Sequence, residues 1–137
     1  MITVKVFIER ANNGKYSVYS DGDDNRLDYG LFGEGYTVEE AKIDFMGCYE
    51  DMRKSYKRQG KIFVEAEFSF EFDMASFLNY YSNVLSLAGL SRVTGVNQQQ
   101  LSHYATGRKR PRPDTVHKIE HSLHNLSKDL SQVRFCV

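Results

Sequence analysis

The residues best suited to chemistry in this sequence are a run of polar side chains followed by a basic cluster. Asn97 precedes three consecutive glutamines, and four Lys and Arg residues follow after a short gap. A glutamine amide can pair with both N6 and N7 of adenine in the major groove. Lys and Arg neutralise the phosphates of a nucleic-acid backbone. These residue types in this order point to double-stranded DNA as a ligand. The candidate base-contacting residues are Gln98 and Gln99, and the candidate phosphate-contacting residues are Asn97, Arg108, Lys109, Arg110 and Arg112.

Two short helices joined by a glycine are expected to position these side chains. One helix is predicted over Leu87–Thr94, Gly95 ends it, and a second is predicted over Gln98–Ala105. Such a pair is the helix-turn-helix arrangement. In the second helix only Leu101 and Tyr104 are expected to face the core, which leaves the glutamines turned outward.

Further helices are expected on both sides of this pair. One begins after Asp73 and runs through Val84, and another begins at Pro113. The apolar residues of the last helix recur at three- and four-residue steps, which suits packing against a core and against a partner helix. The tail Leu126–Val137 is one candidate dimerisation surface, because Val133, Phe135 and Val137 are apolar beyond the helix-turn-helix core. The apolar stripe consists of Val116, Ile119, Leu123, Leu126, Leu130 and Val133.

The stretch G-V-N-Q-Q-Q-L-S-H-Y-A-T-G-R-K-R-P-R-P-D-T-V-H-K-I-E-H-S-L, residues 95–123, resembles the XRE/Cro family of phage-type repressors. The resemblance implies a DNA-binding domain that acts as a dimer, with its recognition helix in the major groove and paired half-sites about one helical turn apart. It also implies the roles stated above for the candidate base-contacting and phosphate-contacting residues, and it adds His103 as a base-contacting residue. The positions in register with the family pattern are Gly95, Asn97, Leu101, Gly107, Pro111 and Ile119.

The first half of the chain has the pattern of strands around one helix. Strands are predicted over Val4–Glu9, Tyr16–Ser20 and Leu27–Leu31, because apolar and polar residues alternate there. A helix is predicted from the capping box T-x-x-E that begins at Thr37. The clearest strand is Ile62–Phe72, which has one apolar face and one largely acidic face.

The two halves also differ in the sign of their charge. Residues 1–75 contain 10 Lys and Arg and 15 Asp and Glu, whereas residues 76–137 contain 8 and 3, so net charges of −5 and +5 cancel. A reversal of this kind suggests two modules with different partners. The sequence therefore predicts an α+β protein, with a β-β-β-α-β domain over residues 1–72 and an all-α helix-turn-helix domain over residues 73–137.

The N-terminal domain resembles that of HicB-type antitoxins, a reduced and inactive relative of the ribonuclease H fold. The resemblance rests on the hairpin K-V-F-I-E-R…N-G-K-Y-S-V and on G-E-G-Y-T-V-E-E-A, residues 33–41. It implies an antitoxin of a type II toxin–antitoxin system, which covers the active site of a small basic, mRNA-cleaving toxin and represses the shared promoter. The residues predicted to contact the toxin, on charge alone, are Glu65, Glu67 and Glu71 with the loop Asp21–Asp24.

The residues do not favour an enzyme. The acidic loop Asp21–Asp28 lacks calcium-loop spacing and is expected to be a solvated turn. The segment Gly30–Gly35 is not followed by the Lys-Ser/Thr of a phosphate-binding loop. The histidines of the last helix lack a second pair of metal ligands, and Cys48 is expected in the core. No catalytic residue, metal or cofactor is therefore expected.

Composition sets the remaining expectations. With 41% apolar and 26% charged residues the chain is of ordinary globular type, and no apolar run is long enough to span a bilayer. Cys48 and Cys136 are expected to be free thiols in a reducing compartment, and the N-terminal residues show no secretory signal, so a cytoplasmic location without a membrane partner is expected.

One alternative is a stand-alone helix-turn-helix regulator whose N-terminal domain dimerises or senses a ligand. The other is a metal-dependent nuclease or hydrolase, which needs two or three convergent carboxylates.

Overall fold

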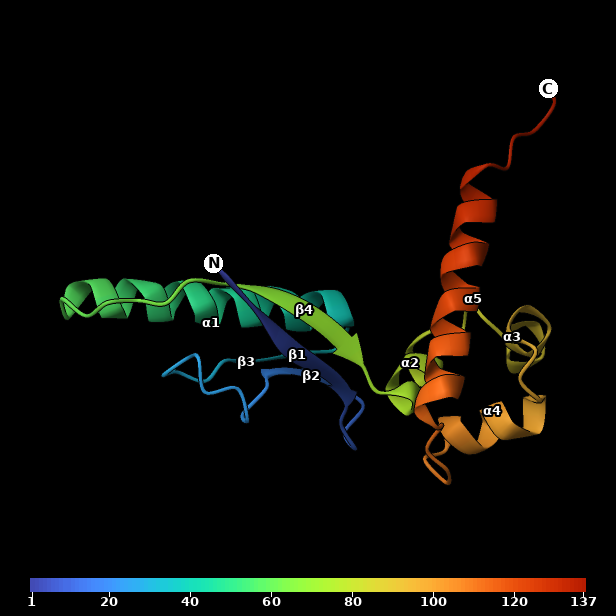
Figure 1. The fold of residues 1–137 in the computed structure, drawn as a ribbon, viewed down its shortest axis with the longest axis horizontal. Coiled ribbons are helices and arrows are strands. Elements are labelled where there is room, and N and C mark those ends of the chain that lie inside the picture. The colour runs from blue at the N-terminus through green and yellow to red at the C-terminus, as the bar shows by residue number, and fades with distance from the viewer. The chain divides into compact units, whose positions relative to one another are not determined.

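A computed structural model describes residues 1–137 and divides the chain into two compact units, Met1–Asp73 and Met74–Val137. The first unit holds the sheet and one helix, and the second is entirely helical (Figure 1). The mixed α+β class predicted from the sequence is confirmed. None of the helices combines the length and the apolar character needed to cross a membrane.

The N-terminal unit is a four-stranded sheet in the order β3-β2-β1-β4. β1 (Ile2–Arg10) and β2 (Tyr16–Ser20) form an antiparallel hairpin, and β3 (Phe32–Gly35) continues the sheet antiparallel to β2. β4 (Ala66–Phe72) pairs parallel with β1 at the other edge. α1 (Val38–Arg58) connects these two edges and lies along one face of the sheet (Figure 1).

The core of this unit lies between α1 and the sheet. Val4, Val6 and Ile8 of β1 are almost fully buried on the covered face. Phe45 of α1 packs edge-on against Phe68 of β4, with 5.0 Å between the ring centroids. The phenylalanine face of β4 is therefore the core face that its alternating sequence predicts.

α1 begins at the predicted capping box. The Thr37 hydroxyl accepts the backbone N–H of Glu40 at 3.1 Å, and the Glu40 carboxylate accepts the N–H of Tyr36 at 2.9 Å. In the usual capping box that carboxylate would bind the N–H of the cap residue itself. The Glu40 N–H is therefore the one of the four unpaired N–H groups at the helix start that a side chain satisfies, and the Tyr36 N–H lies one residue before the cap.

Gly33 and Gly35 let α1 lie directly on β3. A Cβ atom at Gly33 would stand 2.3 Å from the backbone nitrogen of Phe45, and one at Gly35 would stand 2.6 Å from Cβ of Glu40. Neither position has room for a side chain. The glycine-rich character of this segment therefore serves close helix–strand packing.

The third strand is not where the sequence pattern predicts it. The segment Leu27–Leu31 is irregular, with a bend at Asp28 and Tyr29, and the strand is Phe32–Gly35. The Tyr29 hydroxyl donates to the Val64 carbonyl at 2.6 Å, and its ring stacks on Phe63 at 4.9 Å. The alternation in this segment thus reflects packing against the chain before β4, not pairing in the sheet.

β4 also begins later than predicted. The sequence predicts a strand from Ile62, but the ladder starts at Ala66. Ala66 is opposite Ile2, the first residue of β1, so the residues before Ala66 have no β1 strand residue beside them. The segment Lys61–Glu65 has no regular secondary structure, and Ile62 is 90% exposed.

The C-terminal unit contains α2 (Met74–Tyr80), α3 (Leu87–Thr94), α4 (Gln98–Ala105) and α5 (Pro113–Ser131). The bounds of α3 and α4 are those predicted. Side chains from all four helices and from the α3–α4 turn form one apolar core. Its buried residues are Leu78, Leu90, Val96, Leu101, Tyr104 and Ile119.

Two helix ends in this unit differ from the prediction. α2 ends at Tyr80 and the next residues form turns, so Val84 is 71% exposed instead of lying on a helix. The N–H groups of Val84 and Leu85 both donate to the Tyr81 carbonyl, which tightens the chain into that turn. α5 ends at Ser131, so Val133 lies beyond the helix that its spacing suggests.

Candidate nucleic-acid interface

The turn between α3 and α4 is fixed by two residues. The Thr94 hydroxyl donates to the Leu90 carbonyl at 2.7 Å and accepts the N–H of Val96 at 3.1 Å. Gly95 has φ of 73°, a left-handed conformation that favours glycine. The turn therefore has a defined shape, and Val96 is buried beneath it.

The three glutamines in the first turn of α4 differ in their exposure to solvent. Asn97 caps the helix, since its side-chain oxygen accepts the N–H of Gln99 at 2.8 Å. Gln98 and Gln99 are exposed, as predicted for base contact. Gln100 is half-buried and donates from Nε2 to the Tyr104 hydroxyl at 3.1 Å. Two of the three glutamine side chains therefore face solvent.

Four of the predicted contact residues come together around one hollow beside α4, which is lined by Asn97, Gln99, Gln100, His103 and Lys109. His103 is half-buried, and its Nδ1 atom is buried without a hydrogen-bond partner. The His103 carbonyl accepts the N–H of Lys109 at 3.2 Å, so the basic loop starts against α4. Buried polar atoms are nearly always paired in native proteins, so this Nδ1 atom is an exception to the usual pairing.

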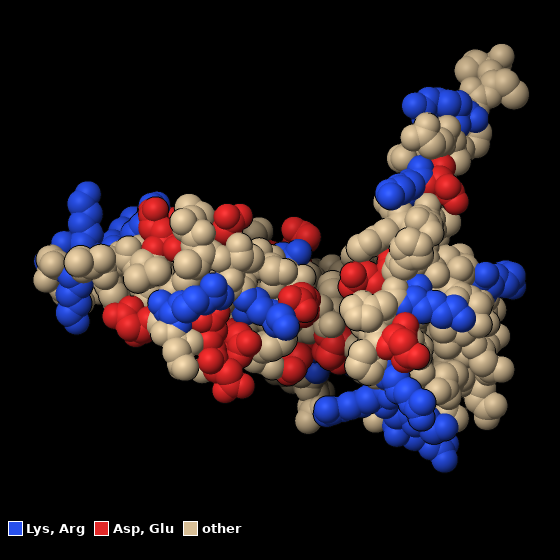
Figure 2. All heavy atoms as spheres, viewed as in Figure 1, with Lys and Arg blue, Asp and Glu red and all other residues tan.

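The other predicted phosphate-contacting residues lie in the loop between α4 and α5. Arg108, Arg110 and Arg112 are exposed, and neither they nor Lys109 form an ion pair within the chain. Figure 2 shows Lys and Arg gathered at the edge of the C-terminal unit where this loop lies. The positive charge is therefore available to an external anion.

Lys118 is a site residue that the sequence interpretation missed. A Cβ atom at Gly95 would lie 3.5 Å from the Lys118 Nζ atom, so the ammonium group of α5 lies against the α3–α4 turn. The sequence feature that could have identified Lys118 is its position directly before Ile119, a core residue of the last helix. Lys118 adds a cation close to the start of α4.

In the N-terminal unit, the sheet face opposite α1, termed here the open sheet face, carries both acidic and aromatic side chains. The strand register places Glu71 opposite Phe7, and Phe7 opposite Tyr19. Phe32 is 51% exposed at the edge of this face. Its acidic members are Glu9, Glu34, Glu67 and Glu71, and Lys5 is its basic member.

One pair of groups on the open sheet face is tightly coupled. The Tyr19 hydroxyl donates to the Glu9 carboxylate at 2.6 Å, and this hydrogen bond, with burial, raises the pKa of Tyr19 to about 12. The phenol ring also lies 5.5 Å from the ring of Phe7. The hydrogen bond and the ring contact therefore hold the Tyr19 side chain in a defined position on the open sheet face.

The structure separates the residues predicted to contact a toxin. Glu67 and Glu71 belong to the open sheet face, whereas the Glu65 carboxylate forms an ion pair with Arg53 of α1 at 3.2 Å. In the acidic loop, Arg26 binds both carboxylate oxygens of Asp24 and lowers the pKa of that carboxyl to about 2. Aromatic residues of the open sheet face were not predicted, because finding them requires the strand order.

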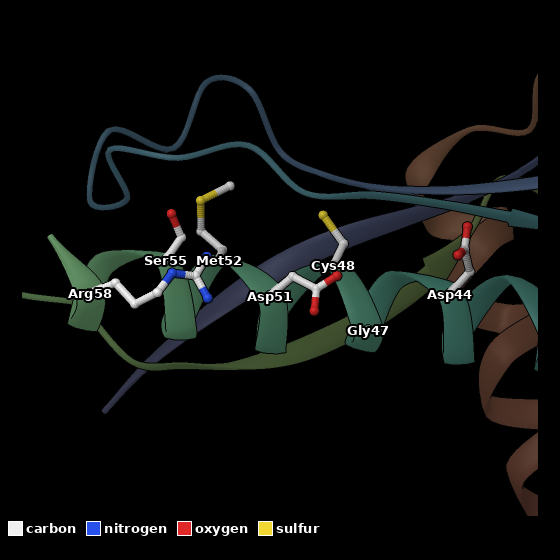
Figure 3. Close-up of a pocket in the computed structure, with 7 residues that line it drawn as sticks. All are labelled: Asp44, Gly47, Cys48, Asp51, Met52, Ser55 and Arg58. Atoms are coloured by element: carbon white, nitrogen blue, oxygen red, sulfur yellow. The ribbon is translucent and has the colours of Figure 1, made fainter.

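One hollow along α1 does not resemble an active site. Its lining residues all come from that one helix, and their polar groups do not converge (Figure 3). Asp44 already accepts the N–H of Glu34 at 2.9 Å. Cys48, expected in the core, is half-buried at the edge of this hollow. Nowhere in the chain do three or more His, Cys, Asp or Glu side chains gather to hold a metal ion.

Comparison with known proteins gave no match. No protein-family model, no curated protein and no solved structure shows detectable similarity to this chain. The resemblances to XRE/Cro repressors and HicB-type antitoxins therefore rest on the motifs quoted above.

Proposed function

We propose that this protein is a sequence-specific DNA-binding repressor of its own promoter that also sequesters a small basic toxin, as the antitoxin of a type II toxin–antitoxin system. The observation that carries the DNA-binding half is the arrangement of α4. Its Leu101 and Tyr104 side chains are buried, while Gln98 and Gln99 face solvent beside an unpaired basic loop.

Stability alone does not account for this arrangement. Three adjacent glutamines at a helix start do not add to the apolar core, and Gln98 and Gln99 make no side-chain hydrogen bond to the rest of the chain. A major groove supplies the missing partners, because a glutamine amide can pair with adenine N6 and N7. The cations of the α4–α5 loop and Lys118 then lie on the same unit to contact the phosphates.

The toxin-binding half of the proposal is supported by the open sheet face. Its four glutamates outnumber its one lysine, and that lysine, Lys5, is within 4.0 Å of Glu71. An acidic surface with exposed aromatics suits a basic protein partner, since complementary charge guides encounter and aromatic rings supply contact area. The identification of that partner as an mRNA-cleaving toxin rests on the resemblance to HicB-type antitoxins.

The DNA-binding proposal is tested by titrating the protein into a labelled duplex from its own upstream region and into a shuffled duplex, at several salt concentrations. The variant is Gln98→Ala/Gln99→Ala, and the matched control is Gln59→Ala, an exposed glutamine at the end of α1. Each bidentate pair contributes about 1–3 kcal/mol of discrimination, so the double variant is expected to lose roughly 30-fold or more of its preference for the native duplex.

Binding to phosphates should depend on salt independently of this preference. If the four loop cations and Lys118 each neutralise one phosphate, the logarithm of affinity falls with the logarithm of salt with a slope of about −4.5. The double variant should keep that slope. Equal and weak binding of the unmodified protein to both duplexes would refute sequence reading.

The toxin-binding proposal is tested by co-purification with a small basic protein encoded next to this one. Glu67→Lys/Glu71→Lys should abolish the complex, whereas Glu39→Lys/Glu120→Lys, two exposed glutamates on helices, should not. A complex that resists the first variant would exclude the open sheet face. If no such neighbour exists and the protein still reads DNA, the stand-alone regulator is the better description.

A further inference from the structure

We propose that the outer edge of β4, termed here the β4 edge, takes up one further strand from a basic protein. The added segment is extended, and in it apolar residues alternate with Lys or Arg. The proposal deepens the toxin-binding half of the proposed function, on which it rests for the identity of that protein. Its main test uses a synthetic peptide, so its outcome does not depend on the existence of a toxin.

β4 ends the sheet and has little protection against pairing with another chain. In the order β3-β2-β1-β4 it has a strand on one side only (Figure 1). Its register with β1 runs from Ala66 to Phe72 without a bulge, and it contains no Lys or Pro. Bulges, lysines and prolines are the usual means of protecting such an edge. The opposite edge, β3, has only four residues and lies against α1.

The apolar core is not closed at the β4 edge. α1 lies against β3 and β2, at the other side of the sheet. On β1, Val4 and Val6 are fully buried. Their neighbours on β4, Phe68 and Phe70, are only half-buried although they belong to the same core face. Apolar side chains of a further strand would cover these two rings.

α1 adds a third apolar group at this edge. The Lys42 Nζ atom lies 4.9 Å from the centre of the Phe70 ring, and the Tyr49 ring lies 5.1 Å from that of Phe68. Met46 lies between Lys42 and Tyr49 on one stripe of the helix, four residues after the first and three before the second. Met46 is 38% exposed. An added strand therefore finds apolar surface on α1 as well as on β4.

The other side of β4 carries the charge that selects the partner. Glu67, Ser69 and Glu71 alternate with the phenylalanines and belong to the open sheet face. Glu67 forms no ion pair within the chain, and Glu71 is 4.0 Å from Lys5, with both side chains about half exposed. Such a surface pair contributes little. Lys or Arg at alternate positions of an added strand would lie opposite these glutamates, which is a favourable cross-strand arrangement.

The same charges disfavour a second copy of this chain at the β4 edge. Two β4 strands paired antiparallel around Ser69 would place Glu67 of each copy opposite Glu71 of the other, on the same face. Like charges directly opposite each other destabilise a strand pair. A basic segment meets no such penalty, and we therefore assign the edge to a basic partner.

The test is an NMR titration with a peptide of alternating Lys and Val as long as β4. Hydrogen exchange of the β4 amides is measured with and without the peptide. The amides that point away from β1 should become protected, because an added strand supplies their hydrogen-bond partners. Docking of side chains on the open sheet face alone would not protect them. A peptide of the same composition, with all its lysines before all its valines, is the control and should give no protection.

Charge reversal tests the acidic side of the β4 edge. Glu67→Lys/Glu71→Lys should weaken binding of the alternating peptide by about tenfold or more, because two attractive pairs become repulsive. Glu39→Lys/Glu120→Lys makes the same change of charge at two exposed glutamates on helices and should bind the peptide like the unmodified chain.

A single substitution tests the apolar side. Met46→Ser should weaken binding of the peptide by about threefold or more, since it removes apolar contact area. Val93→Ser is the matched control, because Val93 of α3 is also 38% exposed. Unchanged circular dichroism and melting temperature show that each variant remains folded.

Failure of the alternating peptide to protect the β4 amides overturns the proposal, and so does equal protection by the control peptide. Protection that grows with protein concentration in the absence of peptide would assign the edge to a second copy and also overturn it. If a neighbouring basic protein binds without protecting these amides, the toxin-binding proposal stands and this one falls. If the peptide protects them and no such neighbour exists, this proposal stands without the toxin.

Discussion

Replacing Gly33 with alanine tests whether α1 lies directly on β3. The added Cβ would stand 2.3 Å from the Phe45 nitrogen, 2.5 Å from the Ala41 carbonyl oxygen and 2.7 Å from the Phe45 Cα. All three are backbone atoms of α1, so no change of rotamer relieves the contact. Ordinary contacts begin at 3.4 Å, and the helix must therefore move by about 1 Å from the strand.

The cost of that movement follows from overpacking. Extra methylenes in a packed core destabilise by about 1–3 kcal/mol, and we expect about 3 kcal/mol here because a whole helix must shift. The gain from stiffening the unfolded chain, about 0.4–1 kcal/mol for Gly→Ala, only partly offsets this cost. In a domain of this size each kcal/mol lowers the melting temperature by about 4–8 °C, so the net decrease should be about 8–20 °C.

The assay must distinguish the two units, since they need not unfold together. Amide signals of Val6 and Val18 report on the sheet during heating, and that of Leu101 reports on the C-terminal unit. Gly30→Ala is the matched control, because a Cβ there meets nothing within 4 Å. If Gly33→Ala melts like Gly30→Ala, α1 does not rest on β3. A loss of the Leu101 signal at the same lowered temperature would show that the two units unfold as one.

Three further changes have defined outcomes. Tyr49→Phe removes the hydroxyl that accepts the buried N–H of Ala66 at 3.1 Å, and should lower the free energy of unfolding by about 1–3 kcal/mol in denaturant titration. Thr37→Ala removes the cap of α1 and should cost about 1 kcal/mol in the same assay, whereas Thr37→Ser should cost less. Asp24 has its pKa lowered from 3.8 to about 2 by Arg26, so its stabilising contribution is present above pH 3.8 and is lost as the pH falls toward 2. Arg26→Ala should raise that pKa toward 3.8 in an NMR titration of the carboxyl carbon, with the remaining shift due to the backbone N–H of residue 26, which still donates to Asp24. An unchanged pKa would contradict the side-chain pairing.

The elements that the sequence predicts best are those whose ends are set by neighbouring residues. α3 and α4 have their predicted bounds because Ser86 and Asn97 cap them and Gly95 turns the chain between them. The cap of α1 at Thr37 is equally local. Each of these signals acts within a few residues, so no knowledge of the tertiary structure is needed to interpret it.

The wrong strand predictions concern contacts between distant residues. Leu27–Leu31 alternates like a strand, but Tyr29 is held by Phe63 and Val64, more than thirty residues later. The start of β4 depends on the parallel register with β1, which is likewise a long-range property. Alternation of apolar and polar residues indicates that the two sides of a segment face different environments. It does not identify which other segment of the chain lies beside it.

The candidate site residues divide in the same way, into those placed by neighbouring residues and those placed by contacts between distant parts of the chain. Residues of α4 and its following loop are close in sequence, so their gathering around one hollow follows from helix geometry. The predicted acidic set spans several elements, and the structure divides it because Arg53 holds Glu65. Phe7 and Tyr19 become neighbours only when β1 and β2 pair in the observed register.

A net charge of zero is compatible with two surfaces of opposite sign, because ions in solution limit the range of each. The Debye length is about 8 Å at physiological salt, so an exposed charge acts mainly on groups within that distance. The cations of the α4–α5 loop and Lys118 belong to one unit, and the glutamates of the open sheet face belong to the other. A DNA backbone docked on α4 therefore experiences those cations, and a basic protein docked on the sheet experiences those glutamates. The charge relevant to each partner is the local one, which is why the reversal of sign along the sequence is more informative than the total.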